Sequence, residues 1–256
     1  MWSRSAYASA PVGCPAAPFN PATLGLSLWI EGRDLPASGV NWQSRASAGS
    51  SGSVVTDWVG GSAGPQSLAH PPSVAPCGLD TAHFSSSPYS LLKIVQDSAY
   101  PIIDSVDGTI VAVFRYYAGR DFGFGPFYTS AVISELSSNW KLQMDPTGHA
   151  MVSAYTASGV QSAVTANAVS SGDWCIAEAQ FTGTECRVRL NRGAWSSFAT
   201  PRYVTGIGTI FLGCDGAFGT IVDCDVAAIM AANSVLSGAT LASLEHYGEW
   251  LIGTTV

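Results

Sequence analysis

The chain has 256 residues, of which 47% are hydrophobic and only 11% are charged, and its formal net charge is −7. This composition excludes an intrinsically disordered protein, because disorder requires low hydrophobicity and high charge. The acidic balance and the presence of only two lysines disfavour nucleic acid or an anionic membrane as partners, since both need a basic patch. The length fits one large all-β domain.

The first 20 residues are rich in Pro, Ala and Ser and contain no continuous apolar stretch, so they do not resemble a secretory signal. We therefore expect the protein to be made and kept in a cytoplasm, or released by lysis. Residues 1–20 are interpreted as an N-terminal arm that docks on the domain or on a neighbouring subunit, and residues 21–256 as a single domain.

Ten segments have the composition of β-strands, rich in Val, Ile, Phe, Tyr and Thr and bounded by Gly, Pro, Asn or Asp. They are 24–30, 81–84, 109–117, 141–144, 149–156, 161–168, 173–181, 185–191, 209–212 and 223–230. In 185–191, Cys186, Val188 and Leu190 are predicted to share one face, and a turn is predicted to begin at Asn191. Many short strands without intervening helices favour an antiparallel sandwich or jelly roll over a parallel α/β fold. Residues 36–76 show little periodicity and are interpreted as an ordered cover loop held by its tryptophans.

One helix is predicted over residues 239–251. Ser237 can cap its N-terminus, and Gly253 stands where a C-terminal cap is expected. Its apolar residues recur at helical spacing and form one face; they are Leu241, Leu244, Tyr247 and Leu251.

The two ends of the chain resemble a known family. The start reads Leu24-Gly-Leu-Ser-Leu-Trp-Ile-Glu-Gly-Arg-Asp34, and the end reads Leu236-Ser-Gly-Ala-Thr-Leu-Ala-Ser-Leu-Glu-His-Tyr-Gly-Glu-Trp250 after a Gly-rich turn and a strand. Together they are similar to the opening strand and closing helix of laminin-G-like, concanavalin A-like domains of bacterial surface proteins and tailed-phage virion proteins. The resemblance covers residues 20–253 and implies an all-β antiparallel jelly-roll sandwich with one short C-terminal helix.

Folds of this family also host retaining glycosidases, which need two carboxylates about 5.5 Å apart. No two glutamates of this chain share a strand at a suitable spacing, and Glu245 and Glu249 are interpreted as a solvated helix face. Nucleophile-elbow and phosphate-binding glycine motifs are also absent from the sequence. We therefore expect no enzyme, with a glycoside hydrolase as a remote alternative.

The cysteines show no Cys-x-x-Cys spacing, which argues against a zinc site. Cys214 and Cys224 flank a glycine that can centre a hairpin, so a bridge and free buried thiols both stay open. Asp215, Asp223 and Asp225 form the densest acidic group. They are either weak candidates for Ca²⁺ ligands at the sandwich rim or simple turn residues, and no other cofactor is indicated.

The segment 116–128 interleaves aromatic residues with glycines after a strong strand. Its aromatic side chains can bind a protein neighbour or stack on sugar rings, or they can fill one end of the core. The candidate binding residues are Tyr116, Tyr117, Phe122, Phe124, Phe127 and Tyr128.

The resemblance and the composition leave a structural protein of a tailed-phage virion as the main hypothesis. It would be a head decoration, head fibre or tail-tip component that contacts capsid or tail proteins, and other copies of itself as a homo-oligomer. The alternative is a lectin-like, glycan-binding module of a bacterial surface or secreted protein, with an extracellular location.

Overall fold

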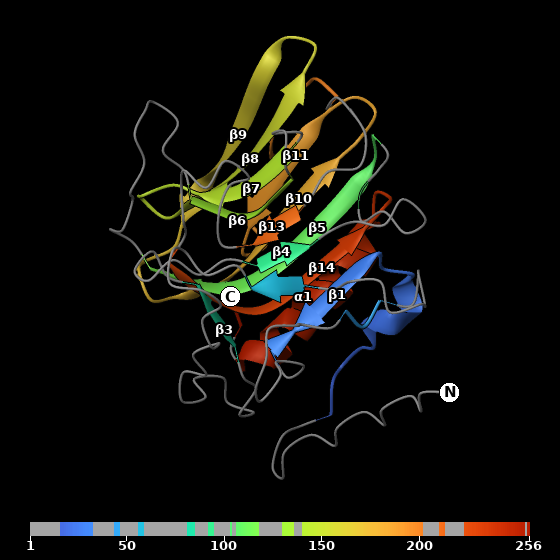
Figure 1. Cartoon of the computed structure of the whole chain (residues 1–256), viewed down its shortest axis with the longest axis vertical. Coiled ribbons are helices and arrows are strands. Elements are labelled where there is room, and N and C mark those ends of the chain that lie inside the picture. Colours follow the sequence, from blue (N-terminus) through green and yellow to red (C-terminus); the bar gives the residue numbers. More distant parts are fainter. Residues whose placement is uncertain are drawn as a thin grey trace.

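The computed structural model describes residues 16–32, 44–46, 56–58, 81–84, 92–94, 103, 106–117, 130–135, 140–201, 210–212, 223–253 and 255–256. Within these ranges the chain forms two antiparallel sheets, with one α-helix against the outer face of one of them (Figure 1). The protein is therefore mostly β-sheet with a C-terminal helix, as the sequence predicts. None of the helices in the described ranges is long and apolar enough to span a bilayer.

The first sheet contains both ends of the domain. Its strands follow the order β1 (Leu28–Glu31), β14 (Cys224–Ala232), β5 (Gly108–Tyr116), β10 (Trp174–Phe181), β11 (Cys186–Leu190) and β12 (Ser196–Phe198), and β3 (Ala82–Phe84) also pairs with β14. The opening strand thus lies beside the closing strand, which is the relation implied by the resemblance of the chain ends.

The second sheet packs against the inner face of the first. Its order is β2 (Thr56–Trp58), β4 (Leu92–Ile94), β13 (Ile210–Leu212), β6 (Ser130–Glu135), β7 (Trp140–Met144), β8 (His149–Thr156) and β9 (Gly159–Ala168). The main core fills the space between the sheets. The predicted alternation in β11 is confirmed, because Cys186, Val188 and Leu190 are buried while Arg187 and Arg189 face the other side.

Helix α1 (Gly238–Ile252) covers part of the outer face of the first sheet. The Ser237 hydroxyl accepts a hydrogen bond from the Thr240 amide at 3.2 Å, and Gly253 adopts a left-handed conformation with φ of 65°, so both predicted caps are confirmed. The predicted apolar face packs against Trp29 of β1 and Val113 of β5, among others.

Glu31 connects the opening strand to the helix in the interior. Its carboxylate accepts hydrogen bonds from the Trp29 indole Nε1 at 2.6 Å and from the Tyr247 hydroxyl, and Arg45 Nη1 lies 3.6 Å away. Because the Glu31 side chain is fully buried, these donors and the nearby charge compensate its loss of water.

Two sequence predictions about local structure need correction. The first strand begins at Leu28 rather than at residue 24, because Pro21–Leu24 forms a 3₁₀ turn. The Asn20 side chain caps this turn, and Gly25 ends it with φ of 62°. Strands β2, β4, β6 and β12 were not predicted, and three of them have only three residues each.

Several predictions fall partly or wholly outside the described residues. These are most of the N-terminal arm, most of the cover loop 36–76, and Cys214. Of the cover loop, residues 44–46 lie along β1, where Arg45 N donates to Trp29 O at 2.6 Å. Cys224 is a buried free thiol in β14.

Candidate functional site

A polar and aromatic row crosses the outer face of the first sheet, and at one end of the row Trp174 packs against the apolar cluster under α1. His83 of β3 pairs in register with Asp225 of β14, Asp225 with Arg115 of β5, and Arg115 with Trp174 of β10. Their sequence neighbours, such as Phe114, belong to the inner core, so alternation places the row on the outer face.

Asp225 is the centre of this row. Its Oδ1 lies 2.7 Å from His83 Nδ1, and its Oδ2 accepts from Arg115 Nε at 3.0 Å, from Arg115 Nη2, and from the Tyr117 hydroxyl at 2.7 Å. Asp223 adds a second carboxylate, with Oδ1 3.7 Å from His83 Nε2. The side chains of three neighbouring strands, β3, β14 and β5, are thereby joined at one end of the sheet.

The charges of the row stabilise one another. Burial raises the pKa of Asp225, but the hydrogen bonds from His83, Tyr117 and Arg115 outweigh burial and hold it below its usual value. The hydrogen bond to Asp225 raises the pKa of His83, although burial opposes it. Burial, followed by the hydrogen bond to Asp225, raises the pKa of Tyr117.

This arrangement bears on the calcium candidates. Both oxygens of Asp225 are occupied by nitrogen or hydroxyl partners, and Asp215 lies outside the described residues. Across the described ranges, no cluster of three His, Cys, Asp or Glu side chains is placed to hold a metal ion. Asp225 therefore acts as an ion-pair acceptor within the sheet.

Arg115 also positions two aromatic rings. Its guanidinium carbon lies 5.3 Å from the centre of the Tyr117 ring and 5.4 Å from the centre of the Trp174 ring. Cation–π attraction over such distances stabilises both rings, and the buried Asp225 fixes the guanidinium between them. Trp174 is half-buried, so part of its indole surface stays exposed to solvent.

A groove of about 510 Å³ opens beside Trp174. It is lined by Ala168, Val169, Ser170, Gly172, Asp173, Trp174, Asn191, Thr255 and Val256. The groove is open, and its lining combines one large aromatic ring with small and polar residues, a combination that suits a polar ligand with one apolar face.

The loop that forms the groove wall is fixed by backbone hydrogen bonds. Gly172 N donates to Tyr116 O at 2.7 Å, Val169 N donates to Gly148 O at 2.9 Å, and Gly172 has φ of 92°. On the opposite wall, Asn191 has φ of 50°, and its Oδ1 accepts from Ile176 N at 2.8 Å. The predicted turn at Asn191 is confirmed, and the groove is pre-formed.

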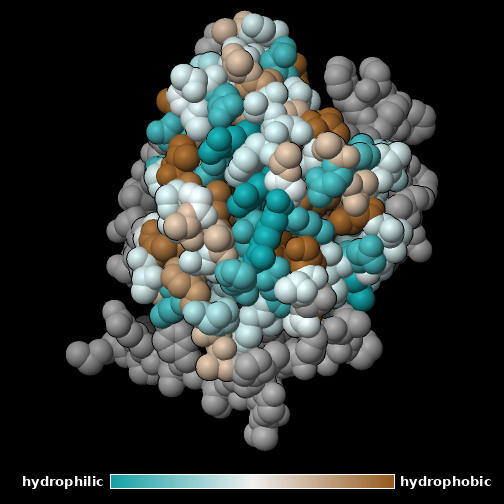
Figure 2. Space-filling model, turned by 180° about the vertical axis from the view of Figure 1, so that it is seen from behind, coloured by the Kyte–Doolittle hydropathy of each residue, from teal (hydrophilic) through white to brown (hydrophobic). Residues whose placement is uncertain are grey.

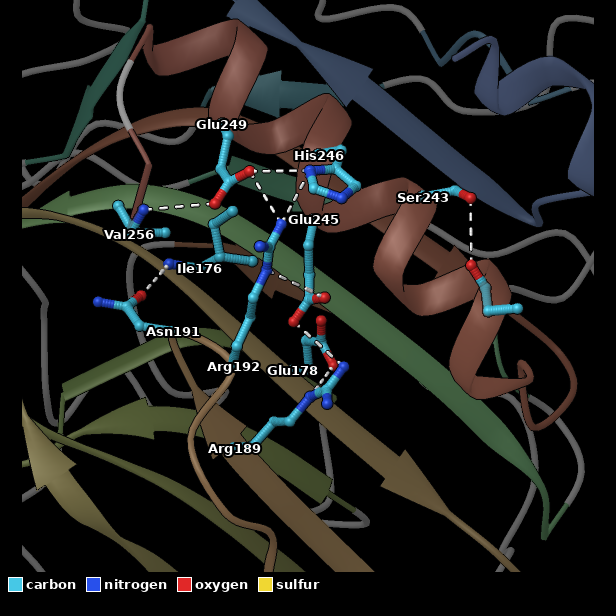
Figure 3. A network of polar contacts seen from close by, with 11 residues as sticks. Ile176, Glu178, Arg189, Asn191, Arg192, Ser243, Glu245, His246, Glu249 and Val256 are labelled. Atoms are coloured by element: carbon cyan, nitrogen blue, oxygen red, sulfur yellow. Dashed lines mark hydrogen bonds and ion pairs between the residues drawn. The ribbon is translucent and has the colours of Figure 1, made fainter. Parts of the chain in front are cut away.

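A second polar network lies under α1 (Figure 3). Arg189 Nε donates to Glu178 Oε2 at 2.6 Å, and Arg189 Nη2 lies 3.1 Å from Glu245 Oε1. Arg192 reaches Glu245 at 3.5 Å and Glu249 at 2.8 Å. The interpretation of Glu245 and Glu249 as a solvated face is wrong, because the arginines of β11 and its following turn cover both carboxylates.

Glu178 is the most deeply buried acid of this network. Its Oε1 has no hydrogen-bond partner within the described part of the chain. Burial is the main cause that raises the pKa of Glu178 to about 7; the hydrogen bond and charge of Arg189 oppose this rise, and the nearby Glu245 adds to it. Because the helix covers these acids, they are not an accessible pair for chemistry on a substrate.

The predicted aromatic segment contributes only in part. Tyr116 is buried, with its hydroxyl donating to Asp145 O at 2.9 Å, while half-buried Tyr117 joins the row. Phe122, Phe124, Phe127 and Tyr128 lie outside the described residues. Sequence reasoning missed Trp174, Arg115 and His83. A signal was present, because Arg115 and Asp225 interrupt otherwise apolar strands.

Seen from behind the view of Figure 1, the molecule shows a mixed surface (Figure 2). Hydrophilic groups gather across the middle of this face, and hydrophobic groups lie to either side of them.

No protein-family model matches the chain, and neither does any curated protein. Solved structures do match. The binding domain of Paraclostridial Mosquitocidal Protein 1 is 13% identical with a TM-score of 0.61, and the match covers 87% of this chain and 52% of that one. A botulinum neurotoxin type C structure, described as dependent on two ganglioside molecules for cell entry, is 9% identical with a TM-score of 0.60, covering 90% and 52%.

A third match is the binding domain of botulinum neurotoxin DC in complex with SialylT, which is 7% identical with a TM-score of 0.60, covering 88% of this chain and 51% of that one. At these identities the likeness shows a shared fold alone. The chain spans about half the length of each of these three structures.

Proposed function

We propose that the chain is a non-enzymatic carbohydrate-binding module whose ligand docks in the groove beside Trp174. The observation that carries the proposal is the partly exposed indole, braced from one side by Arg115 at the edge of a pre-formed polar groove. Aromatic rings stack on the apolar faces of sugars, while neighbouring amide, hydroxyl and carboxylate groups bind their hydroxyls.

The fold comparisons support a binding role. The three matched structures are toxin binding domains or a toxin described by its ganglioside interaction, and none is described as catalytic. Because each match covers about half of the toxin structure, the activities of those proteins enter here only as part of the proposal. An extracellular or surface location fits this function.

The comparisons give no support to a virion role, to capsid or tail partners, or to a homo-oligomer. The concanavalin A-like assignment within the β-sandwich class and the docking role of residues 1–20 stay predictions from the sequence. The burial of the Glu178, Glu245 and Glu249 carboxylates is a further argument against glycoside hydrolysis.

A glycan array probed with the full chain and with Trp174→Ala tests the proposal. We expect wild-type binding to a restricted set of oligosaccharides and at least a ten-fold loss of affinity for Trp174→Ala, taking as a guide the stacking of nucleobases on aromatic side chains, which contributes about 1–3 kcal/mol. Trp195→Ala is the matched control. Trp195 is also half-buried and lies 4.7 Å from two arginine guanidiniums, but it does not line the groove.

Two outcomes would overturn the proposal. One is the absence of binding to any glycan by a folded wild-type chain. The other is a Trp174→Ala variant that binds as well as the wild type and the Trp195→Ala control.

A further inference from the structure

Every arginine within the described ranges is already paired with a carboxylate. The pairs are Arg45 with Glu31, Arg115 with Asp225, Arg187 with Glu185, Arg189 with Glu178 and Glu245, and Arg192 with Glu245 and Glu249. Several of these acids are almost fully buried, so an arginine that turned toward a ligand would leave a buried charge without its partner.

The groove beside Trp174 has its own charge pattern. Among the described residues that line it, Asp173 has the only charged side chain, and this side chain is exposed. Its Oδ2 accepts a hydrogen bond from Ser170 N at 3.2 Å, which holds the carboxylate at the groove wall. Two positive groups lie next to the groove, and both are paired. Arg115, over the Trp174 ring, binds Asp225, and Arg192, which follows the lining residue Asn191, pairs with Glu245 and Glu249.

Acidic sugars need a different surface. A sialic or uronic acid carboxylate is bound best by a free arginine, which offers two parallel N–H donors, or by another unpaired cation. In this groove it would meet the Asp173 carboxylate and would lose water without gaining a charged partner, which disfavours binding. Hydroxyl groups of an uncharged sugar can donate to that same carboxylate.

We propose that the groove selects uncharged oligosaccharides and discriminates against their sialylated or uronic-acid counterparts. This inference rests on the proposed carbohydrate-binding function and names the ligand class of the same site. It separates this chain from two of the matched toxin structures, which are described with gangliosides and with SialylT.

The test uses matched pairs of oligosaccharides that differ by one acidic residue, such as lactose and sialyllactose, titrated into the full chain by calorimetry. For each pair that binds, we expect the neutral member to bind at least about ten-fold more tightly at low ionic strength. This difference in affinity between the neutral and the acidic oligosaccharide should be smaller at about 1 M salt, where the Debye length is about 3 Å.

Asp173→Asn should reduce the affinity ratio between the neutral and acidic oligosaccharides several-fold, because it removes the negative charge from the groove. The asparagine keeps a side-chain oxygen that can accept the hydrogen bond from Ser170 N. Asp107→Asn is the control, since it changes the net charge equally at an exposed position outside the groove.

The outcomes separate this inference from the proposed function. If the acidic members bind as tightly as the neutral ones while Trp174→Ala still abolishes binding, the site is correct and the neutral selectivity is wrong. If Asp173→Asn has the same affinity ratio between neutral and acidic oligosaccharides as the wild type, the role given to Asp173 is wrong. If no pair binds, or if Trp174→Ala has no effect, the proposed function fails and this inference fails with it.

Discussion

The outer face of the first sheet has two parts that use the same chemistry for different ends. Under α1, Arg189 pairs with the buried acids Glu178 and Glu245, and the pairs join the helix to the strands. Farther along this face, Arg115 pairs with the buried Asp225 and contacts the rings of Tyr117 and Trp174, both of which are partly exposed.

The difference lies in what covers each pair. A buried arginine–carboxylate pair contributes little net stability but is costly to break, so under the helix it fixes how α1 sits on the sheet. No helix of the described ranges lies above the Arg115–Asp225 pair, and this pair fixes the geometry of the partly exposed Tyr117 and Trp174 rings. The position of α1 therefore separates the structural part of this face from the candidate binding part.

The largest expected effect comes from breaking a pair in the covered part. Arg189→Ala removes the arginine that pairs with the buried Glu178 and Glu245 carboxylates. We therefore expect the free energy of unfolding to fall by about 3 kcal/mol. Arg115→Ala should cost clearly less, because Asp225 keeps the hydrogen bonds from His83 and Tyr117. Urea unfolding measures the loss in the free energy of unfolding for both variants, and equal losses for Arg189→Ala and Arg115→Ala would contradict this expectation.

The pH dependence of stability gives a smaller effect. Burial raises the pKa of Glu178 from 4.5 to about 7 in the folded protein, so its contribution to stability is fully present below the unfolded value and is lost as pH rises through about 7. We expect the stability of the wild type to fall relative to Glu178→Gln across this window. The raised pKa of His83 acts in the same direction, but it is common to both proteins and cancels in the difference.

Urea unfolding of the wild type and Glu178→Gln at several pH values between about 4.5 and about 8 checks this expectation. A difference in stability that does not change with pH would show that Glu178 is ionised in the folded protein throughout. In that case, Arg189 would dominate over burial.

Much of the fold could be predicted because local sequence determines it. The alternation around Val188, the Ser237 cap and the Gly253 cap each arise from residues close together in the chain, and all are confirmed. The exposed face of α1 could not be predicted, because helical spacing does not reveal that Arg189 and Arg192 cover Glu245 and Glu249 from another element.

The candidate site was missed for a related reason. His83, Arg115, Trp174 and Asp225 are far apart in sequence, and only the strand order and register bring them into one row. Sequence reasoning instead favoured a local cluster of aromatic residues, and of its two described members Tyr117 joins the row while Tyr116 is buried. A site built across strands leaves a weak signal, namely charged residues inside apolar strands.

The most direct test of the central claim is an NMR titration of the protein with ¹⁵N-labelled tryptophan, using the uncharged oligosaccharide that binds best. Trp174→Phe and Trp195→Phe assign the two indole signals. We predict that the Trp174 signal shifts in a saturable manner with added ligand and that the Trp195 signal does not move. A saturable shift at Trp195 or at another tryptophan, with Trp174 unchanged, would contradict the groove beside Trp174 as the binding site.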